Sequence, residues 1–136
     1  MYTVRKVTDD LFWVGVNDHR TTLFENVAIG EVWFCSGQSN MEMPVAGWGK
    51  VLNYESEIES SWHPTIRLFQ VKKATSLVPM ETGESTMGGW KECSPKSVPE
   101  FSALAYFYAR ELQKKLNIPI GVIDCTWGGT PAEAWT

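Results

Sequence analysis

The sequence predicts an α/β fold built on a parallel sheet, and three observations support this prediction. The continuous apolar run Val32-Trp33-Phe34-Cys35 is typical of a buried parallel strand. Residues 101–116 have the periodicity of an amphipathic helix, and the apolar run Ile120–Thr126 follows this helix directly. A strand, a crossover helix and a second strand in this order form a right-handed βαβ unit, in which the two strands are parallel.

The helix between residues 101 and 116 is the clearest single element. A capping box, Ser97-Val98-Pro99-Glu100, precedes it, and Asn117 and Pro119 mark its end. Its lysines come late, where the helix dipole favours positive charge. The apolar residues that recur at helical spacing should cover one face of the sheet: Phe101, Leu104, Ala105, Tyr108, Ala109, Leu112 and Leu116.

The remaining elements are weaker. Residues 11–16 and 21–24 are predicted to form a β-hairpin, with turn residues between them. Residues 41–63 suggest a loop with a helical turn, and the alternating run Ile66–Val71 predicts another strand. Residues 72–99 are rich in proline and glycine, so little regular structure is expected there.

Length and composition narrow the classes of protein to which this chain can belong. The chain has 136 residues, which suits one domain, with 43% hydrophobic residues and a net charge of -4. Mild acidity argues against nucleic acid and anionic membranes as partners, and no apolar run is long enough to span a bilayer. The N-terminus does not resemble a signal peptide, so a cytoplasmic location is expected for the chain as given.

The three cysteines are too far apart for a zinc site, and we expect them to be small buried hydrophobes: Cys35, Cys93 and Cys125. We therefore expect neither a metal nor a cofactor. The seven tryptophans are a high number for this length. Core packing and a sugar-binding cleft, in which a flat ring stacks on a pyranose, explain them equally well.

Ser39 is the candidate nucleophile. It follows Gly37 in a turn at the carboxyl end of a predicted parallel strand, where open α/β sheets bind ligands. Such a turn would expose the hydroxyl and free the Ser39 N–H to stabilise an oxyanion. A plain structural turn has the same Gly-x-Ser pattern, so Ser39 alone leaves both interpretations open.

Gly128 and Gly129 lie between another predicted strand and a helix that should begin near Thr130-Pro131. Free N–H groups in such a loop attract negative charge. Together with Ser39 they form half of an acyl-transfer site. The other half needs a histidine base, but His19 lies in the N-terminal hairpin and His63 lies at the amino end of its strand, so both suit structural roles better.

Residues 30–43, Gly-Glu-Val-Trp-Phe-Cys-Ser-Gly-Gln-Ser-Asn-Met-Glu-Met, closely resemble the nucleophile block of the sialate O-acetylesterases, a family of SGNH (GDSL-like) hydrolases. Further matches follow in the family's order at residues 90–95, 101–107, 118–123 and 127–135. The resemblance covers residues 29–136. It implies a three-layer α/β/α, flavodoxin-like fold, of which this chain is a truncated N-terminal portion.

The resemblance also implies roles for single residues. Ser39 would be the nucleophile, its N–H and one from Gly128 or Gly129 would be oxyanion donors, and Gln38, Asn40 and Trp127 would contact the substrate. That substrate would be an O-acetylated sialic acid or another acetylated sugar, hydrolysed through an acetyl-serine. Family members are often secreted, periplasmic or lysosomal. A further polar donor and an Asp and His pair would come from blocks beyond residue 136, so we expect the chain as given to be inactive.

Residues 1–28 differ from the family and are predicted to form an atypical hairpin segment ahead of an esterase portion at 29–136. Residues 7–18 and 22–26 resemble the opening of the A-type flavoproteins, although no His-x-His cluster follows. Two alternatives to an esterase therefore stay open. The chain could be a non-catalytic remnant that binds sugar weakly, or a module of a metal-dependent flavoprotein.

Overall fold

The computed structural model describes residues 3–6, 12–15, 26–49, 51–78, 80 and 83–135, and for 3–6, 12–15 and 135 it describes the backbone alone.

The centre of the molecule is a four-stranded sheet in the order β3-β6-β4-β5. Its strands are β3 (Glu31–Gly37), β4 (His63–Gln70), β5 (Lys91–Cys93) and β6 (Ile120–Thr126). Both β3 and β4 run parallel to β6, which confirms the predicted parallel sheet, and β6 has the predicted bounds. The antiparallel strand β5 was not predicted, and it lies within the stretch expected to be irregular.

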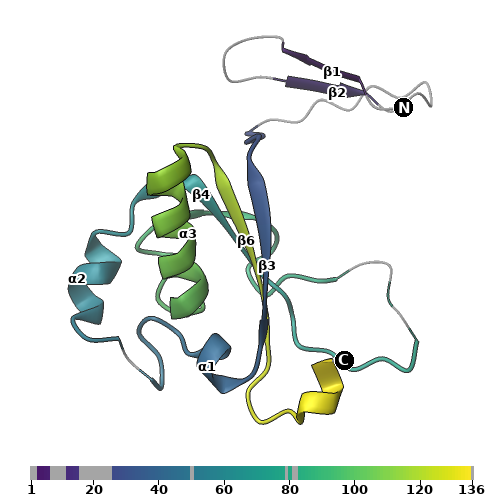
Figure 1. Ribbon diagram of the computed structural model, residues 1–136, viewed down its shortest axis with the longest axis vertical. Helices are drawn as coiled ribbons and strands as arrows, with labels where there is room; N and C mark the ends of the chain where they lie inside the picture. Colours follow the sequence, from purple (N-terminus) through teal and green to yellow (C-terminus); the bar gives the residue numbers. More distant parts are fainter. Residues whose placement is uncertain are drawn as a thin grey trace.

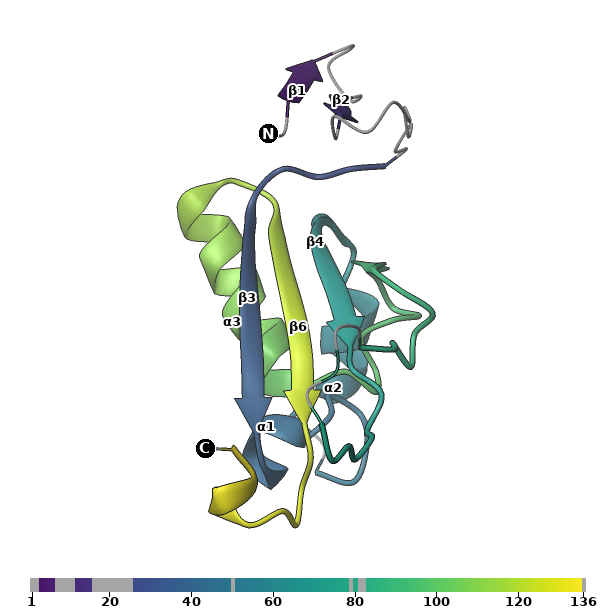
Figure 2. The same cartoon turned by 90° about the vertical axis from the view of Figure 1, so that its right-hand side faces the viewer.

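The register places the carboxyl ends of the three parallel strands at one edge of the sheet. Gly37, the last residue of β3, lies opposite Thr126 at the end of β6, and Gln70 at the end of β4 lies opposite Asp124. Figure 2 shows the three arrows pointing the same way. The loops that follow β3, β4 and β6 therefore leave the sheet side by side, although they are far apart in the sequence.

Helix α3 (Ala103–Leu116) packs along one face of the sheet, and α2 (Tyr54–Glu59) lies on the same side (Figure 1). The short helix α1 (Ser39–Glu42) follows β3, and the 3-10 helix η1 (Ala132–Trp135) follows β6. An α/β fold with a parallel sheet is thus confirmed. The helix expected near Thr130-Pro131 is present only as the single turn of η1.

The start and the buried face of α3 differ from the prediction. Its N-cap is Ser102 rather than Ser97, because the Ser102 hydroxyl accepts the Ala105 N–H at 3.1 Å while the Ser97 hydroxyl donates to the Glu92 carbonyl. Tyr106 is fully buried alongside the predicted Ala105 and Ala109. Three predicted core residues of the helix are instead exposed: Leu104, Tyr108 and Leu116.

Strand β3 is less buried than its apolar sequence predicts. Cys35 is buried, but Val32 and Phe34 are 62% and 64% exposed. Val32 and Phe34 alternate with Trp33 and Cys35 and therefore lie on the other face of the strand, and β3 is also at the edge of the described sheet. Trp33 is partly covered by an edge-on contact with Tyr108 of α3, with 5.4 Å between ring centroids.

The core lies between the sheet and α3, and its largest buried side chains include Ile66, Leu68, Phe101, Tyr106 and Ile120. Cys35 and Cys93 are buried as predicted, whereas Cys125 is only half-buried, and all three are free thiols. Burial raises the pKa of Cys93 to about 12, which keeps this thiol protonated.

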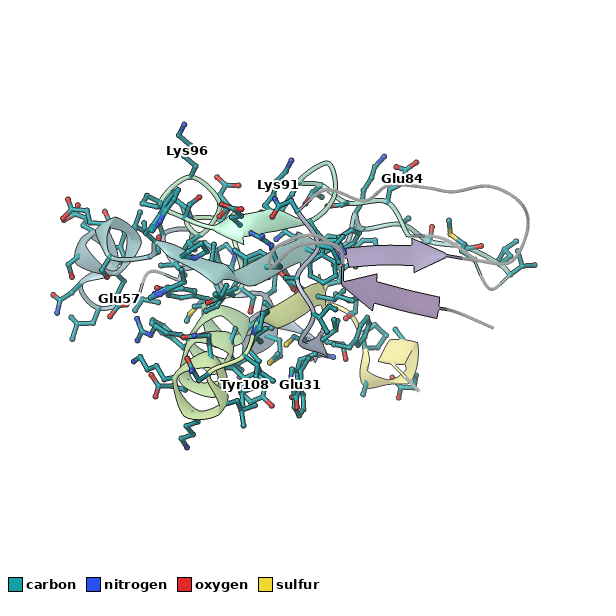
Figure 3. All side chains as sticks on the ribbon, turned by 90° about the horizontal axis from the view of Figure 1, so that it is seen from above. Glu31, Glu57, Glu84, Lys91, Lys96 and Tyr108 are labelled. Carbon is teal, nitrogen blue, oxygen red and sulfur yellow. The ribbon has the colours of Figure 1, made fainter. Side chains whose placement is uncertain are left out.

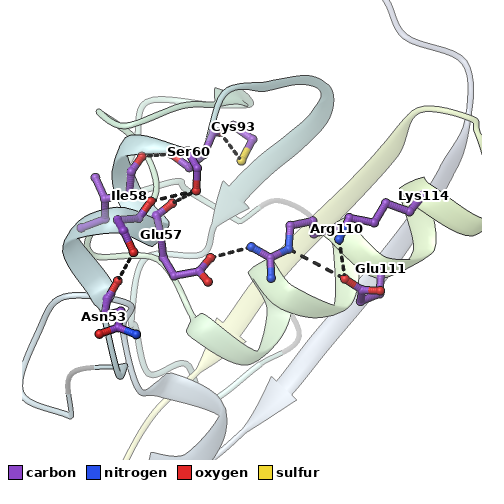
Figure 4. Close-up of polar contacts among 10 residues, drawn as sticks. Asn53, Glu57, Ile58, Ser60, Cys93, Arg110, Glu111 and Lys114 are labelled. Atoms are coloured by element: carbon purple, nitrogen blue, oxygen red, sulfur yellow. Dashed lines mark hydrogen bonds and ion pairs between the residues drawn. The ribbon is translucent and has the colours of Figure 1, made fainter.

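A polar contact joins α2 to α3 beside this core (Figure 4). Arg110 Nη1 donates to Glu57 Oε2 at 2.5 Å, and the Arg110 guanidinium lies 4.8 Å from the Phe107 ring centroid. Figure 3, seen from above, shows Lys91 and Lys96 near the β5 edge of the sheet, and Tyr108 beside Glu31 near the β3 edge.

The N-terminal segment forms a separate two-stranded sheet of β1 (Thr3–Lys6) and β2 (Phe12–Gly15), paired antiparallel. The strand predicted within residues 11–16 is confirmed, but its partner is β1. The predicted partner, residues 21–24, lies outside the described residues. In the part of the chain that is described, no helix has the length and apolar character needed to cross a bilayer.

Candidate active site

Ser39 lies at the carboxyl end of β3, as the first residue of α1, and its side chain is exposed. Gly37 makes the preceding turn with φ of +145°, a conformation that favours glycine. A Cβ at this position would also lie 2.9 Å from Met41 Cγ. The backbone therefore turns sharply enough to present the serine hydroxyl at the edge of the sheet.

Helix α1 is held in place by the start of α3. The Ser102 hydroxyl donates to the Met41 carbonyl at 2.6 Å, and the Ala103 N–H donates to the Met43 carbonyl at 2.8 Å. Ser102 is fully buried and also caps α3. One side chain thus fixes both the helix that carries Ser39 and the helix that covers the sheet.

The loop after β6 lies against the Ser39 turn. The Trp127 N–H donates to the Gly37 carbonyl at 2.9 Å, and the Gln38 side-chain amide donates to the Thr130 carbonyl. A Cβ on Gly128 would lie 3.1 Å from Ser39 Oγ, so the Gly128 backbone borders the serine hydroxyl directly. The structure therefore brings together Ser39 and the Gly128-Gly129 loop, which are 89 residues apart, from 39 to 128, in the sequence.

Glu42, which the sequence analysis did not single out, lies at the centre of this edge. One of its carboxylate oxygens accepts the Gly128 N–H, and the other pairs with the Lys73 ammonium. Burial alone would raise the pKa of Glu42, but the hydrogen bonds from Lys73 and Gly128 and the Lys73 charge lower it overall. The only hint in the sequence is that Glu42 follows Ser39 by three residues and shares its helix face.

A second polar group lies at the end of β6, beside Glu42. Asp124 is 1% exposed and accepts hydrogen bonds from Thr126 Oγ1 at 2.7 Å and Gln70 Nε2 at 3.2 Å. Burial raises the pKa of Asp124, while the hydrogen bonds from Thr126, Gln70 and the Ser102 backbone oppose that rise. Glu42, Lys73, Gln70, Asp124 and Thr126 all line a cavity of about 590 Å³.

The predicted substrate-contacting residues have different surroundings. Gln38 uses its amide to hold the Thr130 carbonyl, and Asn40 is exposed. Trp127 is half-buried, with the Lys73 ammonium 6.0 Å from its ring centroid. None of the tryptophan side chains that the structure describes is fully buried: Trp33, Trp48, Trp62, Trp90 and Trp127.

His63 is the first residue of β4, at the edge of the sheet opposite to Ser39, as its position before Pro64 predicts. It packs near the Tyr106 ring, with 6.4 Å between centroids. Burial and the charges of Arg110 and Lys114 lower its pKa. His19 lies outside the described residues, and no histidine within them reaches Ser39. The same residues contain no cluster of three or more side chains suited to hold a metal ion.

The described residues thus place a serine turn against a glycine loop at one edge of an α/β sheet. Residues 29–136 match the family profile described as carbohydrate esterase, sialic acid-specific acetylesterase. The chain belongs to this family, as the resemblance of its motifs predicted. Sialate O-acetylesterases from Pongo abelii and Homo sapiens are each 30% identical over 122 residues, which is 85% of this chain, and the protein from Rattus norvegicus is 29% identical.

A carbohydrate acetylesterase from Xanthomonas citri has a similar solved structure. It superimposes with a TM-score of 0.73 at 33% identity and covers 93% of this chain. The match spans 28% of that structure and 23% of the human and orangutan relatives, so this chain corresponds to about a quarter of their length.

Proposed function

We propose that this chain carries the nucleophile and oxyanion half of an acetylesterase site that acts on O-acetylated sialic acid or a related acetylated sugar. In this reaction Ser39 Oγ attacks the acetyl carbonyl carbon, and the sugar oxygen leaves with a proton. Water then hydrolyses the acetyl-Ser39 ester and releases acetate. The sugar class rests on the family and on the relatives' names.

The observation that carries the proposal is the contact between Ser39 and the loop after β6. A nucleophile needs nearby N–H donors at the position where negative charge develops, and these must be fixed before the reaction begins. The Gly128 backbone borders Ser39 Oγ, and the Trp127 N–H and the Gln38 amide tie the loop to the serine turn. Both sides of the half-site are therefore held rigidly relative to each other.

The proposal places the general base outside the described residues, because His63 is at the opposite edge of the sheet. We propose accordingly that the 136-residue chain reacts slowly, with solvent hydroxide in place of a histidine. Acyl transfer to Ser39 should then be slow at neutral pH and accelerate as the pH rises.

Peptide mass spectrometry tests the proposal. We expect incubation with 4-nitrophenyl acetate, and more slowly with O-acetylated sialic acid, to leave an acetyl group on Ser39. The Ser39→Ala variant should carry none at this peptide, and Ser36→Ala, three residues earlier in β3 and also exposed, should behave like the parent. If the Ser39→Ala variant released acetate as fast as the parent, Ser39 would not be the nucleophile.

The competing function is a non-catalytic remnant that binds sugar. The absence of a base among the described residues and the exposed tryptophans favour it. A fluorophosphonate probe separates the two functions, because N–H donors beside Ser39 would stabilise the negative charge that develops as the probe reacts and would raise labelling at Ser39 above that of other exposed serines. Labelling at Ser39 supports the esterase half-site, whereas sugar binding without labelling supports the remnant.

A further inference from the structure

Glu42 joins three loops that leave the same edge of the sheet. It lies in α1 after β3, it pairs with Lys73 in the loop after β4, and it accepts the Gly128 N–H from the loop after β6. Its side chain is 22% exposed, so these contacts are only partly screened by water. The Lys73 ammonium in turn lies 6.0 Å from the Trp127 ring centroid, so the ion pair also borders the loop after β6.

A carboxylate beside the serine raises an electrostatic difficulty. The reaction places negative charge on the acyl oxygen near Gly128, and an unpaired carboxylate in that position would oppose it. The Lys73 ammonium removes this conflict because it neutralises Glu42 from the side away from Gly128. Asp124 is the other acidic group near Glu42, and its raised pKa reflects burial first and the Glu42 charge only in part.

The hydrogen bond from the Gly128 N–H to Glu42 determines which glycine N–H can serve as the oxyanion donor. Because Glu42 occupies the Gly128 N–H, that group is not free for an acyl oxygen. Gly129 follows it with φ of +79°, and a Cβ there would meet no atom within 4 Å, so the Cβ side of this residue is not crowded. The loop can therefore be anchored through one N–H and still offer the next one.

We propose that Glu42 is a positioning residue: its carboxylate, neutralised by Lys73, holds the Gly128 N–H and thereby fixes the loop so that the Gly129 N–H serves as the oxyanion donor beside Ser39. This inference rests on the proposed esterase function for its catalytic meaning. The clamp itself is a structural arrangement, and it can be measured without turnover.

Amide NMR of the 136-residue chain tests the clamp directly. In the parent, the Gly128 amide proton should follow the protonation of Glu42, at a pH below the ordinary range of a glutamate. In Glu42→Gln this pH dependence should disappear while the hydrogen bond stays. In Glu42→Ala we expect hydrogen exchange at Gly128 to be at least about tenfold faster. An unchanged Gly128 signal in Glu42→Ala would overturn the proposal.

The rate of Ser39 acylation by 4-nitrophenyl acetate tests the positioning role. Loss of the clamp displaces the loop, so Glu42→Ala should react about 10- to 100-fold more slowly. Glu42→Gln still offers an oxygen to Gly128 and should stay within about fivefold of the parent. Equal losses in both variants would mean that the charge, and not the position of the loop, is what matters, which would overturn the proposal.

The matched control is Glu84→Ala. Glu84 pairs with Lys72 at 2.8 Å, next to Lys73 in the sequence, but both partners are mostly exposed and Glu84 does not line the cavity beside Glu42. Glu84→Ala should leave both the Gly128 amide signal and the rate of Ser39 acylation unchanged. If the parent chain shows no Ser39 acylation at all, the proposed function fails for this chain, and the NMR result alone then decides on the clamp.

Discussion

Substitution of Gly128 by alanine tests how tightly the serine turn and the glycine loop fit together. The added Cβ would lie 2.6 Å from Glu42 Oε2 and 3.1 Å from Ser39 Oγ. Ordinary contacts of a Cβ begin near 3.4 Å, so the loop or the Glu42 carboxylate must move by the difference, 3.4 - 2.6 = 0.8 Å. This displacement would disturb the hydrogen bond between the Gly128 N–H and Glu42, which we propose to hold the oxyanion donor in position.

A misplacement of about 1 Å at a reacting centre costs on the order of 100-fold in rate. We therefore expect Gly128→Ala to lower the rate of fluorophosphonate labelling at Ser39 by about 100-fold. Overpacking of this kind costs about 1–3 kcal/mol of stability, so the variant should remain folded if the chain has an ordinary margin. Circular dichroism at the labelling temperature checks that the fold is retained.

Gly129→Ala is the matched control for this experiment. Its Cβ would meet no atom within 4 Å, although the φ of +79° strains any L-residue by about 1–2 kcal/mol. It keeps its N–H, so labelling should fall by at most about 5- to 30-fold, the equivalent of that strain. Labelling of Gly128→Ala at the parent's rate, or a larger loss in Gly129→Ala, would refute the close fit at Gly128.

Three further predictions concern the core and the surroundings of the site. Ser102→Ala removes the N-cap of α3 and the bond to the Met41 carbonyl, so urea unfolding should show a loss of about 2 kcal/mol, whereas the exposed Ser60→Ala should change little. Cys93, with a pKa of about 12, should resist iodoacetamide at pH 8 until the chain is unfolded; rapid alkylation of the native chain would contradict its burial. Lys73→Met should raise the pKa of Glu42, measured by carboxyl carbon NMR.

The Lys73→Met prediction also gives the direction in which stability should change with pH. Glu42 has a lowered pKa in the folded chain, so its ionised form contributes stability above the ordinary glutamate pKa, and this contribution is lost as the pH falls through the lowered value. In Lys73→Met this contribution should be smaller, and its loss should be complete at a higher pH. Acid unfolding profiles that coincide for parent and variant would show that the ion pair has no effect on Glu42.

Elements with strong local patterns could be predicted from the sequence. The apolar run of β6 is bounded by Pro119 and by the glycines after Trp127, and its predicted bounds are the observed ones. The end of α3 was also predicted, because Asn117 adopts the left-handed conformation that ends helices. The predicted start of α3 was wrong because both Ser97 and Ser102 could cap the helix. Ser102, the observed cap, also contacts α1.

Features that depend on distant contacts could not be predicted. Strand β5 has three residues, and only its pairing with β4 makes it a strand. The exposure of β3 follows from the face on which Val32 and Phe34 lie and from its place at the edge of the sheet, which its own sequence does not encode. The role of Glu42 depends on strand order, because β6 must lie between β3 and β4 before residues 42, 73 and 128 can meet.

The acetyl group on Ser39 is the most direct measure of the proposed function. We expect tandem mass spectrometry of the chain, quenched in acid after incubation with 4-nitrophenyl acetate, to place the acetyl group on Ser39, with more label as the pH of incubation rises. The label should be absent from Ser39→Ala and strongly reduced in Gly128→Ala. An acetyl group that appears only on lysine side chains, with Ser39 unmodified at every pH, would contradict the assignment of Ser39 as the nucleophile.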